Sequence, residues 1–166
     1  MSPVTPNGRT STQGAAGTVA LPRPAVAACG TGDLTVSLAV SGVGGAAPRA
    51  GAPVRLAATL GSTVACRLTM GPGAARLGVN SGADRVWDSA RCPVATTGLG
   101  PVGQALVLPA QVTVPAAGTA LVNVVWPAVR LGAGCTPAPT ALRAGTYTAN
   151  LQLPGAPPAI TAFQLR

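Results

Sequence analysis

The carboxylates are the residues whose type and spacing come nearest to supporting chemistry. Only three are present, Asp33, Asp84 and Asp88, and only the last two lie close together in the sequence. On an extended strand, Asp84 and Asp88 would point to one side but lie roughly 13 Å apart. The two carboxyl groups of a glycosidase lie within about 10 Å of each other. We therefore expect Asp84 and Asp88 to pair locally with Arg85 or Arg91, or to cap turns.

The composition excludes most other routes to catalysis. The chain has no histidine, lysine or glutamate, so a serine or threonine hydroxyl lacks a base and a Cys–His dyad is excluded. Asp84, Asp88 and Asn80 would make a weak calcium site at best. No glycine-rich loop precedes a helix, so a phosphate cradle is not expected. The sequence predicts a non-enzymatic protein with no catalytic residues, no cofactor and no metal ligands.

Four cysteines are the next candidates for a defined role: Cys29, Cys66, Cys92 and Cys135. Their wide spacing and the absence of histidine do not fit a zinc site. An even set of this kind favours two disulfides and an oxidising compartment. Three connectivities are open, of which we favour Cys29–Cys66 and Cys92–Cys135. The alternative is four free cysteines that act as small buried apolar residues.

The basic charge has two interpretations. The formal net charge is +8, and all eleven basic residues are arginine. A basic surface could attract nucleic acid, an acidic polysaccharide or a lipid surface. The arginines are scattered, however, without the aromatic platforms on which bases stack, so nucleic acid is not the expected partner. Arginine in place of lysine, beside abundant alanine, glycine and proline, is also typical of a GC-rich genome.

The termini and the hydropathy give few targeting signals. No stretch is long and apolar enough to cross a bilayer as a helix. Val26–Cys29 resembles a lipoprotein cleavage box, but Arg23 interrupts the apolar stretch that such a signal needs. Residues 1–27 lack periodicity and are expected to form a disordered or extended tail, or an arm that orders against a neighbouring sheet.

From residue 28 onward the pattern is that of strands. Leu34, Val36, Leu38 and Val40 alternate with small or polar residues, which predicts a half-buried strand. Glycine- and proline-containing turns separate similar segments, and none has a helical stripe. The predicted strands are Asp33–Val40, Val54–Leu60, Cys66–Met70, Arg76–Asn80, Asp84–Asp88, Gln104–Leu108, Gln111–Val114, Ala120–Trp126, Gly145–Leu153 and Ile160–Leu165. We expect residues 28–166 to form one all-β, antiparallel sandwich of seven to nine strands.

The four aromatic residues are Trp87, Trp126, Tyr147 and Phe163. The rest of the apolar content is mainly alanine, valine and leucine, so these large side chains are expected to fill the space between the sheets. The alternative is an exposed aromatic platform for a sugar.

An ordered set of motifs resembles known families: Ser81–Cys92, Val122–Trp126, Gly134–Cys135 and Arg143–Tyr147. The set resembles small secreted or envelope-anchored actinobacterial proteins of unknown function with an immunoglobulin-like domain. More distantly, it is similar to the immunoglobulin-like intracellular proteinase inhibitors of bacilli, although no reactive-site residue can be matched. The resemblance implies an immunoglobulin-like fold and an extracellular or cell-envelope location.

Three functions follow as hypotheses. The first is a non-catalytic, extracellular or cell-envelope binding or scaffold domain that recognises a protein or a glycan. The second is a self-assembling surface or coat subunit, possible as a homo-oligomer because low charge leaves strand edges open to pairing. The third is a proteinase inhibitor, which rests on the distant resemblance alone.

Overall fold

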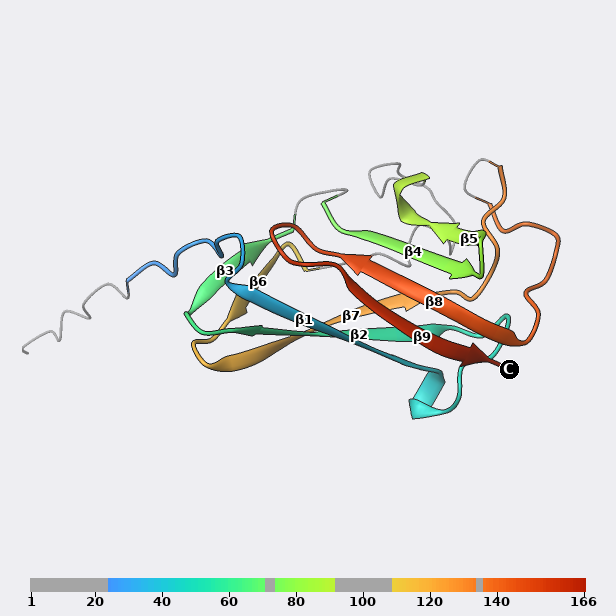
Figure 1. Cartoon of the computed structure of the whole chain (residues 1–166), viewed down its shortest axis with the longest axis horizontal. Coiled ribbons are helices and arrows are strands. Elements are labelled where there is room, and N and C mark those ends of the chain that lie inside the picture. Colours follow the sequence, from blue (N-terminus) through green and yellow to red (C-terminus); the bar gives the residue numbers. More distant parts are fainter. Residues whose placement is uncertain (1–23, 71–73, 92–108, 134–135) are drawn as a thin grey trace, which may run out of the picture.

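The structure is a computed structural model that describes residues 24–70, 74–91, 109–133 and 136–166, and over these residues the chain is all-β with antiparallel sheets (Figure 1). The strands and two single 3-10 turns are β1 (Leu34–Ser41), η1 (Val43–Gly45), β2 (Val54–Ser62), β3 (Cys66–Thr69), β4 (Arg76–Ser81), β5 (Asp84–Asp88), η2 (Ser89–Arg91), β6 (Gln111–Val114), β7 (Gly118–Trp126), β8 (Gly145–Gln152) and β9 (Ala159–Leu165).

Two main sheets form the layers of a β-sandwich. One has the order β1-β2-β7 and the other β5-β4-β8-β9. Strands β3 and β6 pair with each other and extend beyond one end of the first sheet (Figure 1). Each of these pairings is antiparallel, which lets short turns join consecutive strands such as β8 and β9. At one side of the sandwich, β1 of the first sheet packs beside β9 of the second.

The core lies between the facing sides of the two sheets. In β2, Val54, Leu56, Ala58 and Leu60 are fully buried, and the residues between them are more exposed. β7 alternates in the same way through Val122, Val124 and Trp126. The period of two therefore directs one set of side chains inward and leaves the other set on the outer face.

The edge strand β5 departs from this alternation. Val86 and Trp87 are adjacent, yet both are buried. The pairing with β4 shifts register here, because Val79 lies opposite Trp87 whereas the next residue, Asn80, lies opposite Arg85. Val86 is thus the extra residue of a β-bulge, which turns the two ends of β5 relative to each other.

Most predicted strands are present, with boundaries that differ by one or two residues. The largest extensions are of two residues, in β2, which ends at Ser62 rather than Leu60, and in β7, which begins at Gly118 rather than Ala120. The predicted strand Gln104–Leu108 lies outside the described residues. So do residues 1–23 of the predicted tail, whereas Ala27 already belongs to the fold, because its carbonyl accepts a hydrogen bond from the Arg67 amide at 2.8 Å.

Candidate binding surface

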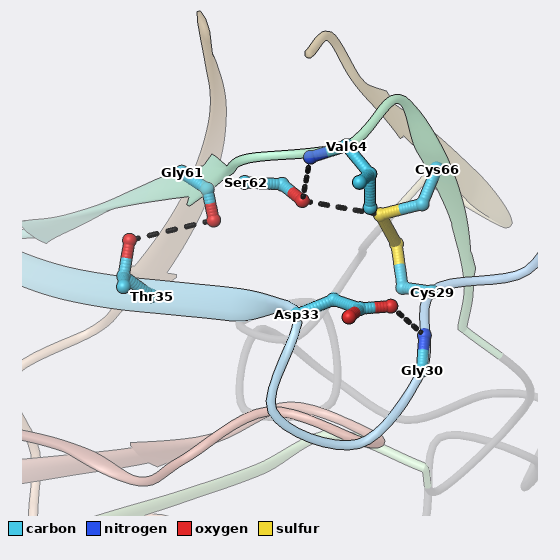
Figure 2. Close-up of a disulfide and its surroundings, with 8 residues drawn as sticks. All are labelled: Cys29, Gly30, Asp33, Thr35, Gly61, Ser62, Val64 and Cys66. Atoms are coloured by element: carbon cyan, nitrogen blue, oxygen red, sulfur yellow. Dashed lines mark hydrogen bonds between the residues drawn. A yellow bond between two sulfur atoms is a disulfide. The ribbon is translucent and has the colours of Figure 1, made fainter. Parts of the chain in front are cut away.

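The predicted Cys29–Cys66 disulfide is present, and Figure 2 shows its surroundings. It spans 37 residues and brings the two Cα atoms to 4.8 Å. The bridge ties the segment before β1 to β3, where the Cys29 amide also donates to the Arg67 carbonyl. Its environment is structural: Ser62 Oγ lies 3.8 Å from Cys66 Sγ and accepts a hydrogen bond from the Val64 amide. The other two cysteines, Cys92 and Cys135, lie outside the described residues, and their pairing stays a prediction.

Asp33, the first of the three carboxylates, stabilises the turn beside this disulfide. Its carboxylate accepts a hydrogen bond from the Gly30 amide at 2.6 Å (Figure 2). A short acidic side chain that bonds a nearby backbone amide is a common way to fix a turn. Asp33 therefore has a local structural role.

Asp88 pairs locally with Arg85, as expected from the sequence. The Arg85 guanidinium donates to the Asp88 carboxylate at 2.8 Å, and the other carboxylate oxygen accepts from the Ala90 amide. Residues three apart on a regular strand point to opposite faces. The bulge at Val86 brings both side chains to the outer face and makes this contact possible.

The prediction that Asp84 pairs with a local arginine is wrong. It forms a two-pronged ion pair with Arg130, which is 46 residues later in the chain, at 3.0 and 2.5 Å. The hydrogen bonds from Arg130 lower the pKa of the Asp84 carboxyl below its usual value. The sequence carries no local signal for this pair, because the segment after β7 comes to lie beside β5 only in the folded chain. Leu131 fixes that return by donating its amide to the Val86 carbonyl.

A polar groove crosses the outer face of β5, β4 and β8. Its volume is about 240 Å³. Charged and amide side chains from all three strands surround it: Arg76, Asn80, Arg85, Asp88, Asn150 and Gln152, together with Gly78 and Ala90. Alternation places them here, because the intervening residues Leu77, Val79 and Leu151 point into the core.

Gly78 leaves the middle of this groove open. It sits on the central strand of the three, directly opposite Asp88 on one side and Asn150 on the other. A Cβ atom added at Gly78 would meet no other atom within 4 Å, so a side chain can begin here without a clash and would project into the groove. The absence of a side chain is what makes this face concave.

A second hollow continues the groove toward the β8–β9 turn. It has a volume of about 490 Å³ and shares Arg76 and Gln152 with the first. These two residues are cross-strand partners on β4 and β8, so they stand where the two hollows meet. Pro154, Gly155 and Ala156 of the turn line the far end. The two hollows together form one extended, open path over the sheet.

Arg76 is the free cation of this path. It is exposed, and no carboxylate or hydrogen-bond acceptor engages it within the described part of the chain. Arg85 differs, because Asp88 neutralises it. The groove therefore offers one free guanidinium, several amide groups that both donate and accept, and one compensated ion pair.

Ser89 supports the groove from behind, and the sequence alone did not identify it. It is 5% exposed, and its Oγ accepts a hydrogen bond from the Leu77 amide at 2.8 Å. The contact anchors η2, which carries Ala90, against β4. A buried serine just after a strand is a weak signal in a sequence, because serine is usually exposed.

The four aromatic side chains lie in the interior and not along the groove. Trp87, Trp126 and Tyr147 are buried, and Phe163 is half-buried against the core. Trp126, Tyr147 and Phe163 form one cluster, with ring centroids 6.0 to 6.4 Å apart. The Tyr147 hydroxyl donates to the Arg143 carbonyl at 2.7 Å. No exposed aromatic platform for a sugar is therefore formed.

No protein-family model matches this chain, and no curated protein is detectably similar to it in sequence. The resemblance to immunoglobulin-like families stays a prediction, and function must be argued from the residues themselves.

The chemistry open to this surface is recognition by hydrogen bonds and charge. The part of the chain that the structure describes holds no group of three or more histidine, cysteine or acidic side chains placed to share a metal ion. Asp84 and Asp88 each have an arginine partner, and Asp33 caps a turn. Within the same residues, no helix is long and apolar enough to cross a bilayer.

Proposed function

We propose that this protein is a non-catalytic extracellular or cell-envelope binding domain whose polar groove recognises an acidic glycan. The observation that carries the proposal is the open path over β5, β4 and β8, with Arg76 free at its middle and Gly78 as its floor. An exposed arginine fork can bind a carboxylate or a sulfate through two parallel hydrogen bonds. The amides of Asn80, Asn150 and Gln152 can bind hydroxyl groups, which alternate with acidic groups along such a chain.

The absence of exposed aromatic rings favours an acidic over a neutral glycan. Neutral sugars offer apolar ring faces that would need an aromatic platform, and Trp87, Trp126 and Tyr147 are buried. Charge attraction can take the place of stacking, and the net charge of +8 raises the concentration of polyanions near the surface.

An immunoglobulin-like fold is part of the same proposal. The order β1-β2-β7 corresponds to strands A, B and E of that fold, and β5-β4-β8-β9 corresponds to C′, C, F and G. The hydrogen bond from Tyr147, near the start of β8, to a carbonyl four residues upstream is like the tyrosine corner of strand F. Both features support the assignment.

The proposed location follows from the disulfide. Cys29–Cys66 would persist in an oxidising compartment and be reduced in the cytosol. A groove for glycans is also useful where the protein meets surface polysaccharides.

Binding to defined polysaccharides tests the proposed ligand. Polygalacturonate and heparin oligosaccharides serve as acidic probes and dextran as a neutral one, with calorimetry on the full chain. We expect binding to an acidic probe, weakened by salt, and none to dextran. Arg76→Ala should weaken the affinity about tenfold or more, which corresponds to the loss of a charge-assisted contact. Gly78→Gln should block the groove without a steric conflict in the fold.

Arg55→Ala is the matched control, because Arg55 is exposed on the outer face of the other sheet. It removes the same charge and should leave the affinity nearly unchanged. Equal losses in the Arg55 and Arg76 variants would mean non-specific charge attraction and would overturn the groove assignment. A groove that binds neither acidic probe would contradict the acidic-glycan proposal and favour a protein partner. A panel of serine and cysteine proteases tests the inhibitor hypothesis separately.

A further inference from the structure

One end of the sandwich gathers exposed arginines from three separate segments. Arg49 lies in the connection between β1 and β2, Arg55 is the second residue of β2, and Arg143 lies just before β8. Figure 1 shows the end of β1 and the starts of β2 and β8 at this end, on the right, whereas β3 and β6 lie at the opposite end. We call this region the basic end and define it by Arg49, Arg55 and Arg143.

Backbone contacts hold these segments together. Arg166, which follows β9, is hydrogen-bonded through its backbone to both neighbours of Arg49 in the sequence, at 2.9 and 3.0 Å. Arg166 also lies beside the start of β8, because the last residue of β9 pairs with Gly145, two residues after Arg143. The fold therefore holds the backbones of Arg49 and Arg143 close to Arg166, so the two charges gather at one place although 94 residues separate them in the chain.

No acidic side chain neutralises the basic end. The whole sequence has three acidic residues, and each is bonded to another group: Asp33 to a turn amide, Asp84 to Arg130 and Asp88 to Arg85. Among the described residues, no hydrogen bond or ion pair holds the guanidinium groups of the basic end. Their positive charge is therefore available to a molecule outside the chain.

An exposed apolar side chain accompanies these charges. Val43 lies in the same connection as Arg49 and is 68% exposed, more than Val64, Leu121, Val125 or Ile160. It begins the short turn η1, in which Gly44 and Gly45 both have positive φ angles, of 67° and 82°. The glycines let the chain reverse tightly there, and Val43 stands in solvent beside a row of small residues.

An apolar hollow of about 310 Å³ lies at the same end. Its lining is mainly alanine, with one valine, one proline and one leucine, and Thr140 supplies the only polar side chain. Arg49 immediately precedes one lining segment and Arg143 immediately follows another. The hollow thus combines an apolar surface with two uncompensated positive charges at its border. The lining residues are Ala50, Gly51, Ala128, Val129, Ala138, Pro139, Thr140, Ala141 and Leu142.

We propose that the basic end docks on the surface of a bilayer that contains anionic lipids. The arginine forks bind lipid phosphates through paired hydrogen bonds. Val43 enters the boundary between headgroups and acyl chains, and the hollow offers a second apolar surface to the carbon atoms of a lipid. A soluble polyanion would satisfy the charges alone, whereas an anionic lipid surface matches the charges, Val43 and the hollow together.

The attachment should be peripheral and reversible. One arginine close to an anionic surface raises the affinity about fivefold, and one exposed valine adds little apolar area. Binding that depends on surface charge weakens with salt. The residues of the polar groove are distinct from those of the basic end and of the hollow, so this proposal does not rest on glycan recognition.

Co-sedimentation of the full chain with lipid vesicles tests the charges. We expect binding to vesicles of phosphatidylglycerol and phosphatidylcholine in equal parts at about 0.1 M sodium chloride, less at about 0.5 M, and none to phosphatidylcholine alone. Arg143→Gln should lower the partition coefficient about fivefold, and Arg49→Gln combined with Arg143→Gln at least tenfold. Arg67→Gln is the matched control, because it removes one charge from β3 at the opposite end and should change the coefficient less than twofold.

Val43→Ser tests whether the partner is a lipid surface rather than a polyanion. It should lower the partition coefficient severalfold, because a serine does not enter the apolar boundary. Val64→Ser, at a residue that is 49% exposed just before β3, is the matched control and should have no effect. Circular dichroism confirms that each variant is folded. Equal binding to both kinds of vesicle, equal losses for Arg67→Gln and Arg143→Gln, or full binding by Val43→Ser would overturn the proposal.

Discussion

The two sheets of the sandwich present very different surfaces to solvent. The outer face of β5, β4 and β8 carries arginines, amides and carboxylates around an open groove. The outer face of β1, β2 and β7 carries small, hydroxylated and aliphatic side chains with Arg55 as its one charge. Inward, both sheets supply the same aliphatic core, so the difference is not required by folding. The two outer faces therefore differ in the contacts that they can make with other molecules.

The edge strands β5 and β7 of the two sheets also differ, in length, regularity and charge. The polar sheet ends in a short, bulged and covered strand, whereas the last described strand of the neutral sheet is the long, regular β7. The bulge also brings Arg85 and Asp88 onto the groove face. One irregularity therefore protects the β5 edge against strand addition and shapes the polar surface.

The largest expected effect comes from removing the disulfide, which braces the neutral sheet. Cys29→Ser combined with Cys66→Ser should lower the free energy of unfolding by up to about 4 kcal/mol on the chain-entropy estimate. Thermal and urea unfolding measure the loss. Neither cysteine of the bridge lines the groove, so glycan affinity should persist at temperatures where the variant is folded. Lost affinity in a folded variant would show that the two sheets are coupled.

A smaller effect should distinguish the two buried serines, Ser62 at the end of β2 and Ser89 in η2. Ser89→Ala leaves the buried Leu77 amide without its acceptor and should cost about 1–3 kcal/mol. Ser62→Ala should cost less, because its bond from the Val64 amide is longer, at 3.3 Å, and Val64 is exposed to water. Urea unfolding of both variants gives the comparison, and a larger loss for Ser62→Ala would contradict it.

Substitutions of two strand glycines, Gly78 and Gly61, should differ in their effect on the free energy of unfolding. Gly78→Thr adds a β-branched side chain in open space on a central strand and should raise the free energy of unfolding by about 0.5–1 kcal/mol. Gly61→Thr lacks that space, because its Cβ would lie 2.7 Å from Thr35 Oγ1, and it should not stabilise. Thermal melts compare the two.

The same two variants should also differ in their affinity for the acidic probe. Gly78→Thr should gain stability and lose affinity for the acidic probe, because the new side chain enters the groove. Gly61→Thr should leave the affinity unchanged. A stabilised Gly78 variant with full affinity would show that the groove floor is not part of the ligand site.

Local pattern in the sequence predicted much of this fold, for physical reasons that apply strand by strand. The alternation in Val54–Leu60 reports directly which side of β2 faces the core. The Cys29–Cys66 bridge belongs to one of the three possible connectivities of the four cysteines. It was favoured because these two cysteines follow each other in the sequence. The bulge at Val86 was not predictable in this way, because two adjacent apolar residues on a strand carry no signal of which register the partner strand adopts.

The candidate groove was less predictable than the fold. Its residues come from β4, β5 and β8, and nothing local shows that Arg76 and Gln152 will be cross-strand neighbours. The partner of Asp84 was missed for the same reason, since Arg130 is brought to it by long-range topology. A surface site whose residues come from distant strands can be predicted only when the order of the strands in the sheet is known. The alternation of residues along each strand does not give that order.

The smallest expected effect belongs to the Asp84–Arg130 pair, which joins the β5 edge to the segment that covers it. The pKa of Asp84 is lowered in the folded state. The pair therefore stabilises the fold above the carboxyl's ordinary pKa, and that contribution disappears as the pH falls through the lower, folded-state pKa. Both groups are partly exposed, so the stabilisation at neutral pH is small.

Asp84→Asn should accordingly lower the melting temperature slightly at pH 7, and the difference from the parent chain should shrink as the pH falls from about 5 toward 2. A double-mutant cycle with Arg130→Gln isolates the pair from other effects of either change. A difference that grows in acid would mean that Asp84 acts through some contact other than Arg130.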